Sequence, residues 1–236
     1  MLIGGLDLGK QSDPSAFAVL DTTLAEDRFT HEPRQHYVVR YLKRWPLGTD
    51  YHVIVEELRL MYQRPPLLGT RLGIDYGNAG TAVVEMFVMA QVMADITAIL
   101  LTGGYGMGGG KEGVHVSKVQ LVGVLISLLS GRRIKIVPVL SESKQLRKEL
   151  EGFQVKITRA LNESFEAAKE RIHDDLVIAL ALAGYIGEVI GMMSCGGVTD
   201  VRITPPKQPH ETYPDRRELQ IVGKRNMPQL RWNLWG

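Results

Sequence analysis

Four aspartates stand at positions where their carboxylates can share one site. Asp7 and Asp75 each end a short apolar run, in "LIGGLDLG" and "RLGIDYG", and a glycine follows each of them two residues later. Asp174 and Asp175 stand side by side directly before the apolar run "LVIALALAGY". Short apolar runs bounded by glycine predict buried strands, and acids before a long apolar run predict the first turn of a helix.

Carboxylates at such positions fit a site for divalent cations. If the strands that end in Asp7 and Asp75 are neighbours, their Cα atoms lie about 5 Å apart at the sheet edge where α/β proteins bind ligands. Crowded carboxylates cannot all stay ionised without a cation, and Mg²⁺ prefers oxygen ligands. Two such ions roughly 3.5–4 Å apart can activate a water and stabilise the leaving oxygen in phosphodiester cleavage. We therefore expect Asp7, Asp75, Asp174 and Asp175 to form a site for hard divalent cations such as Mg²⁺.

Each acid taken alone also has an ordinary explanation. Asp7 and Asp75 fit turn acids that precede a glycine, and Asp174 and Asp175 fit the acids that are common in the first turn of a helix. The metal-site prediction therefore depends on all of these positions coinciding in one fold.

The order of the expected elements indicates a mixed α/β sheet flanked by helices. Three successive strands indicate antiparallel neighbours, and the later alternation of helix and strand indicates parallel ones. This order matches an RNase H-like architecture, in which the first three strands are antiparallel and the next are parallel. We expect strands at 2–9, 15–21, 36–45, 71–77, 95–104 and 133–138, and helices at 48–63, after Gly80, and at 116–131, 141–153 and 173–193.

Several blocks of the sequence resemble one known family. The block "VHVSKVQLVGVLISLLSGRRIKIVPVLSESKQLRKELEGFQVKI" and the later "HDDLVIALALAGY" resemble the C-terminal nuclease domain of the large terminase subunits of tailed bacteriophages. "GGLDLGKQSDPSAFAVLD" resembles the first two strands of that family, and "GIDYGNAG" resembles its second acidic motif. The resemblance covers roughly residues 2–190.

This resemblance implies an endonuclease that cuts concatemeric double-stranded viral DNA during head packaging in the host cytoplasm. By the resemblance, Asp7 matches the first metal ligand of the family and Asp75 matches the second acidic position. Asp174 and Asp175 match the paired acids of the third motif. The resemblance also implies two Mg²⁺ or Mn²⁺ ions, and as partners a terminase ATPase domain, the portal and the small terminase.

Two departures from the family stand out. Complete terminases carry an ATPase motor before the nuclease, whereas this sequence contains no G-x-x-x-x-G-K-[ST]; its nearest string, "YGMGGGKE", has Tyr105 for the first Gly and Glu112 for the hydroxyl residue. We expect an excised nuclease domain or a separately encoded nuclease, with no motor in this chain. Ser117 also precedes Lys118 where the family usually has Pro.

Basic residues that could hold DNA follow the glycine-rich segment. Residues 111–148 contain eight Lys or Arg and two Glu. Such a cluster can bind phosphates without reading sequence, although a solvated helix face gives the same pattern. Lys10, just past Asp7, and His173, just before Asp174, are candidates for a contact to the cut strand and for orienting a water; a turn lysine and a capping histidine are the simpler readings. The expected DNA contacts are Lys111, Lys118, Arg132, Arg133 and Lys135.

The remaining features limit the class of protein. The 236 residues have a net charge of +2 and one cysteine, Cys195, so an intrachain disulfide is impossible. No signal sequence or clean membrane span is evident, and we expect an intracellular protein, monomeric as an isolated domain. Composition changes after the last long apolar run, which predicts a nuclease domain over 1–193 and a basic, proline-containing tail over 194–236.

Other functions remain open from the sequence, among them a non-catalytic binding module with a decayed site. The same fold serves junction resolvases and transposase-type nucleases, which differ in substrate. "LDLGKQSDPSAFAVLD" also resembles the first phosphate motif of actin-like sugar kinases and chaperone ATPases, which need two such domains and usually well over 300 residues.

Overall fold

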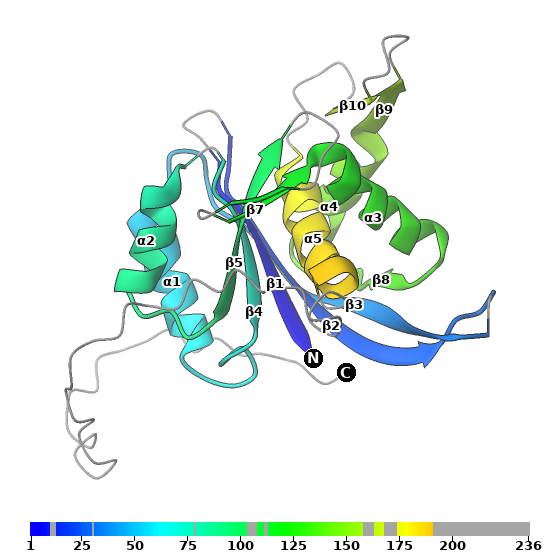
Figure 1. The fold of residues 1–236 in the computed structure, drawn as a ribbon, viewed down its shortest axis with the longest axis horizontal. Helices are drawn as coiled ribbons and strands as arrows, with labels where there is room; N and C mark the ends of the chain where they lie inside the picture. The colour runs from blue at the N-terminus through cyan, green and yellow to red at the C-terminus, as the bar shows by residue number, and fades with distance from the viewer. Residues whose placement is uncertain are drawn as a thin grey trace. The chain divides into compact units, whose positions relative to one another are not determined.

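The computed structural model describes residues 1–9, 13–29, 31–77, 79–102, 108–110, 113–157, 163–167 and 174–190. Within these residues, one large sheet carries helices on both of its faces (Figure 1). The strands of that sheet are β1 (Leu2–Asp7), β2 (Ala16–Glu26), β3 (Pro33–Arg44), β4 (Arg71–Asp75), β5 (Asp95–Thr102), β6 (Gly108–Gly110), β7 (Gly113–Ser117) and β8 (Ile134–Ile136). The helices are α1 (Tyr51–Tyr62), α2 (Thr81–Met89), α3 (Lys118–Ser130), α4 (Ser143–Gly152) and α5 (Asp175–Tyr185), which continues as a π-helical turn over Ile186–Ile190.

The strand order confirms the expected fold class. The sheet runs β6-β7-β5-β4-β1-β2-β3-β8. The first three strands form an antiparallel meander, and β1, β4, β5 and β7 are parallel neighbours. At the outer edges, β8 pairs parallel with β3 and β6 pairs antiparallel with β7. The carboxyl ends of β1 and β4 therefore lie next to each other in the middle of the sheet, as expected from the sequence.

Alternation of side chains divides the core into two layers. Along β1, Ile3 packs into the layer under α3 and α5, whereas Leu6 packs into the layer under α1 and α2. Figure 1 shows α1 and α2 on one side of the sheet and α3, α4 and α5 on the other. Since strand side chains point alternately to opposite faces, Gly5 and Asp7 belong to the α5 face.

Two glycines on that face allow α5 to lie directly on the sheet. A Cβ added at Gly5 would lie 2.1 Å from the carbonyl oxygen of Ala179, and one added at Gly73 would lie 2.3 Å from Cδ1 of Ile186. Any side chain at Gly5 would push the helix backbone away. Because α5 rests on β1 near Gly5, its first turn lies above the carboxyl ends of β1 and β4.

The structure differs from the sequence expectations in several elements. Residues 113–117 form β7, and the helix expected from 116 begins at Lys118. The 133–138 strand shortens to the three residues of β8. A hairpin of β9 (Phe153–Ile157) and β10 (Glu163–Ala167) follows α4 and was not expected.

The apolar pattern explains part of this difference. Val116 is buried in the same layer as the apolar face of α3, so an apolar run that crosses from strand to helix gives no break at the boundary. The expected tail over 194–236 lies outside the described residues. None of the helices that the structure describes is long and apolar enough to cross a membrane.

Candidate active site

A single row of residues across four strands forms the floor of the site. The register pairs Asp75 with Asp7, Asp7 with Ala16, and Ala16 with Arg44. Residues paired in this way point to the same face of a sheet. Asp75, Asp7 and Arg44 therefore all face α5, and the small side chain of Ala16 leaves room above it for the first turn of that helix.

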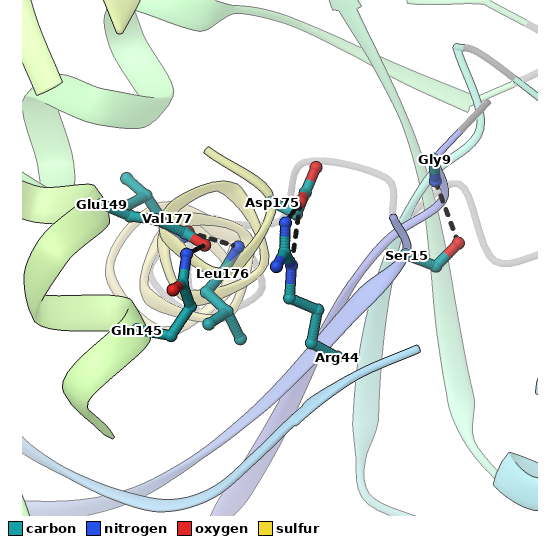
Figure 2. A network of polar contacts seen from close by, with 8 residues as sticks. All are labelled: Gly9, Ser15, Arg44, Gln145, Glu149, Asp175, Leu176 and Val177. Carbon is teal, nitrogen blue, oxygen red and sulfur yellow. Dashed lines mark hydrogen bonds and ion pairs between the residues drawn. The ribbon is translucent and has the colours of Figure 1, made fainter. Parts of the chain in front are cut away.

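The turn after β1 is held on both sides. The backbone N–H of Gly9 donates to Oγ of Ser15 at 3.0 Å (Figure 2), and the Tyr51 hydroxyl donates to the carbonyl oxygen of Gly9 at 2.7 Å. A Cβ at Gly9 would lie 2.0 Å from the carbonyl oxygen of Asp13. These contacts fix the direction in which the chain leaves Asp7.

The N-terminal end of α5 carries the other two acids, and each of them forms an ion pair with a different basic side chain. Nε and Nη2 of Arg44 donate to Oδ2 of Asp175 at 3.3 and 3.1 Å (Figure 2). Nζ of Lys118 donates to Oδ2 of Asp174 at 2.7 Å. Asp175 is 4% exposed, and Asp174 is half-buried. The two adjacent carboxylates therefore pair with side chains of different elements, β3 for Asp175 and the start of α3 for Asp174.

Burial and mutual repulsion perturb the two strand acids. Burial raises the pKa of Asp7 well above its usual value, and the charges of Asp75, Asp175 and Asp174 raise it further. Burial also raises the pKa of Asp75, against the lowering effect of the Gly77 backbone N–H, which donates to Oδ1 of Asp75 at 2.9 Å. Clustered acids with raised pKa values are typical of functional sites, because such a cluster favours binding a proton or a cation.

The donor set fits a hard divalent cation. Four carboxylates offer the oxygen ligands that Mg²⁺ and Mn²⁺ prefer. Within the described part of the chain, no three Asp, Glu, His or Cys side chains already converge as a coordination sphere. The ammonium of Lys118 and the guanidinium of Arg44 instead neutralise two of the four acids.

The lysine at this site depends on the cap of its helix. Ser117 and Gln120 form a capping box: Oγ of Ser117 accepts from the backbone N–H of Gln120 at 3.1 Å, and Oε1 of Gln120 accepts from the N–H of Ser117 at 3.2 Å. Ser117 therefore serves as N-cap at the position where the resembling family usually has Pro. This start of α3 places Lys118 opposite Asp174.

One buried acid beside the site escaped the sequence analysis. Glu149 of α4 is 1% exposed, and its Oε2 accepts from the backbone N–H groups of Leu176 and Val177 at 3.0 and 3.3 Å (Figure 2). Burial raises the pKa of Glu149 to about 7, although its hydrogen-bond donors oppose the shift. The sequence signal that could have revealed Glu149 is its charge at a position three residues after Leu146, on the apolar face of the predicted helix.

Among the expected basic residues that the structure describes, Lys118 alone pairs with one of the four carboxylates. Lys118 reaches the site, whereas Lys135 pairs with Val38, which lies level with Asp21 and Leu2 at the opposite end of β1. Five residues along a strand and three strand spacings separate that level from Asp7, which is about 20 Å. Arg132, exposed at the end of α3, precedes β8 at the same far edge.

The structure corrects the interpretation of Arg133. Its side chain is 7% exposed, and Nη1 donates to Oε2 of Glu188 at 2.8 Å. The Tyr37 hydroxyl donates to the other oxygen of Glu188 at 2.7 Å. A buried, paired guanidinium cannot reach a phosphate, so Arg133 is a structural residue. Lys10, Lys111 and His173 lie outside the described residues.

Comparison with solved structures identifies the same fold elsewhere. The large terminase nuclease of thermophilic phage G20c aligns with a TM-score of 0.53 at 23% identity, over 78% of this chain and 81% of that one. Its magnesium-bound structure gives 0.54 at 22%, over 78% and 80%. A mutant nuclease domain of the large terminase subunit of bacterial virus Sf6, with manganese, gives 0.52 at 14%, over 78% and 87%.

No protein-family model and no curated protein sequence matches the chain. The solved structures therefore carry the comparison, and at these identities they establish the fold. This chain has the fold of the large-terminase nucleases, in agreement with the resemblance found in its motifs.

Proposed function

We propose that this chain is a divalent-metal-dependent endonuclease that hydrolyses phosphodiester bonds of double-stranded DNA. The observation that carries the proposal is the meeting of Asp7 and Asp75, in register on parallel strands, with the acidic first turn of α5. The shared fold supports it, since structures of both compared nucleases contain magnesium or manganese.

The four acids would bind the cations from two sides. Asp7 and Asp75 form the buried floor, and Asp174 and Asp175 approach from the helix above it. When bound, two Mg²⁺ or Mn²⁺ ions would supply an activated water and stabilise the leaving oxygen of the phosphodiester. Arg44 keeps Asp175 oriented, and Lys118 adds positive charge on the side of Asp174 from which a phosphate can approach.

The compared proteins support a proposal for the biological substrate. All three structures are of large-terminase nucleases, two of the phage G20c protein and one of the Sf6 protein. We infer that this chain cuts concatemeric viral DNA during packaging, together with an ATPase domain, a portal and a small terminase. Arg132 and Lys135 are then candidates for contacts to the duplex about 20 Å from the cut.

Cleavage of supercoiled plasmid tests the proposal. Purified protein is incubated with Mn²⁺, Mg²⁺ or EDTA, beside Asp75→Asn and a control, Glu85→Gln, which changes an exposed acid on α2. We expect nicking and linearisation with metal, loss in EDTA and in Asp75→Asn, and normal cutting by the control. Normal cutting by Asp75→Asn would refute the assignment. Preferential cutting of four-way junctions over plain duplex would point to a resolvase instead.

A further inference from the structure

Asp174 occupies the N-cap position of α5 but does not cap the helix. An aspartate at this position usually accepts a hydrogen bond from the N–H of the second or third helical residue, with its own backbone extended. Asp174 makes no such bond, and its backbone lies at φ −110°, ψ 19°. Its carboxylate instead accepts from Lys118, in the candidate active site.

Another helix supplies the missing cap. The backbone N–H groups of Leu176 and Val177, which are among those that a helix start leaves unpaired, donate to Oε2 of Glu149. Figure 2 shows the Glu149 carboxylate reaching from α4 to these two groups. Its other oxygen accepts from Nε2 of Gln145 at 3.0 Å, so α4 itself fixes the orientation of the carboxylate.

The placement of this carboxyl group is specific, because both of its oxygens have hydrogen-bond partners. A negative charge at a helix start interacts with the positive end of the helix dipole. Glu149 is almost fully buried, so leaving its acceptors or the two N–H groups unpaired would be costly. One buried side chain thus does the work that the sequence assigns by position to Asp174.

We propose that Glu149 is a positioning residue that caps α5 in place of Asp174 and thereby releases the Asp174 carboxylate for the active site. This inference rests on the proposed function of that site. Without Glu149, Asp174 turns to the extended backbone of an ordinary N-cap, binds the N–H groups of its own helix and leaves Lys118.

A double-mutant cycle measures this exchange without any assay of cleavage. Melting temperatures are compared for the wild type, Glu149→Ala, Asp174→Ala and the double variant, all in EDTA. In the wild-type background, Asp174→Ala changes the melting temperature little, because Asp174 caps nothing and a half-exposed ion pair contributes little. In the Glu149→Ala background, the same change lowers it by about 2–4 °C, since Asp174 has become the cap.

Cleavage then tests the consequence for the site. With saturating Mn²⁺, Glu149→Ala is expected to lower the maximal plasmid-nicking rate at least tenfold while the DNA concentration for half-maximal rate stays the same. Glu149→Gln restores most of the rate, because its amide oxygen accepts from both N–H groups. Glu151→Ala, which alters an exposed acid of the same helix, serves as the matched control and cuts normally.

The outcomes separate this inference from the proposed function. An equal effect of Asp174→Ala in both backgrounds, or wild-type nicking by Glu149→Ala, would overturn the exchange of caps. If the cycle behaves as expected but the wild type nicks no DNA with either metal, the capping role stands and the nuclease proposal fails. Should Glu149→Ala not fold, Glu149→Leu replaces it, since leucine fills a similar volume and offers no acceptor.

Discussion

Replacing Asp7 by asparagine is expected to stabilise the metal-free protein. Asp7 lies directly opposite Asp75 on the neighbouring strand, and burial together with the charges of Asp75, Asp175 and Asp174 raises the pKa of Asp7. Two ionised carboxylates about 5 Å apart repel by about 3 kcal/mol at an effective dielectric constant of ~20. Because the charge of Lys118 offsets part of this repulsion, we expect Asp7→Asn to raise the free energy of unfolding by about 1–3 kcal/mol.

Metal should reverse the sign of this effect. A cation that binds only the folded protein adds about 4.1 kcal/mol to the free energy of unfolding at 1,000 times its dissociation constant, which exceeds the 1–3 kcal/mol above. Wild-type protein gains this stabilisation, whereas Asp7→Asn loses a charged ligand and gains less. The variant is therefore more stable than the wild type in EDTA and less stable than the wild type in saturating Mn²⁺.

Urea unfolding in EDTA and in Mn²⁺ tests both halves of this prediction. Glu85→Gln is the control, because it removes an exposed carboxylate outside the cluster and should leave both curves unchanged. If Asp7→Asn is less stable than the wild type in EDTA, the four acids are not mutually repulsive. Equal stabilisation of both proteins by Mn²⁺ would remove Asp7 from the metal site.

Two further predictions concern buried charges. Burial raises the pKa of Glu149 to about 7 from an ordinary 4.5. The folded state therefore binds this proton more tightly than the unfolded state does. The stability that the protonated Glu149 contributes is lost as the pH rises from about 4.5 to 7. Relative to Glu149→Gln, the wild type should lose about 3 kcal/mol of unfolding free energy over that range, and a pH-independent difference between the two would contradict the shift. Arg133→Ala should lower the free energy of unfolding by about 3 kcal/mol, because it leaves Glu188 partly buried without its cation, yet leave the salt dependence of DNA binding unchanged; a reduced salt slope would restore Arg133 as a DNA contact.

The strand acids could be placed from sequence because their environment is local. Asp7 and Asp75 end apolar runs bounded by glycine, and the order of the elements makes their strands parallel neighbours. Parallel strands without a bulge between them bring their last residues level, so the meeting of the two carboxylates needs no knowledge of side-chain packing.

Residues that act across elements could not be placed in this way. Arg44 reaches the site because it pairs with Ala16 of β2, which in turn pairs with Asp7 of β1. A register irregularity at Val19 and Leu20 of β2 separates this part of β3 from the rest of the strand. A shift of one residue would turn Arg44 to the other face. Periodicity does not locate such irregularities, so no sequence pattern assigned Arg44 to Asp175.

The same limit explains the basic residues. Lys118 and Arg133 belong to one basic segment of the chain, but α3 carries the chain from one edge of the sheet to the other between them. Residues that are close in the sequence therefore lie far apart in the fold. The burial of Arg133 against Glu188 depends on the position of the π-helical turn after α5, which carries Glu188.

The arrangement of partners suggests how the acidic site remains folded without a bound cation. Asp175 and Asp174 are neutralised by Arg44 and Lys118, whereas Asp7 and Asp75 have raised pKa values. A divalent cation at such a site would favour the ionised form of the strand acids and would compete with Lys118 for Asp174. Because Glu149 already caps α5, this competition can proceed without unravelling the helix that carries two of the acids.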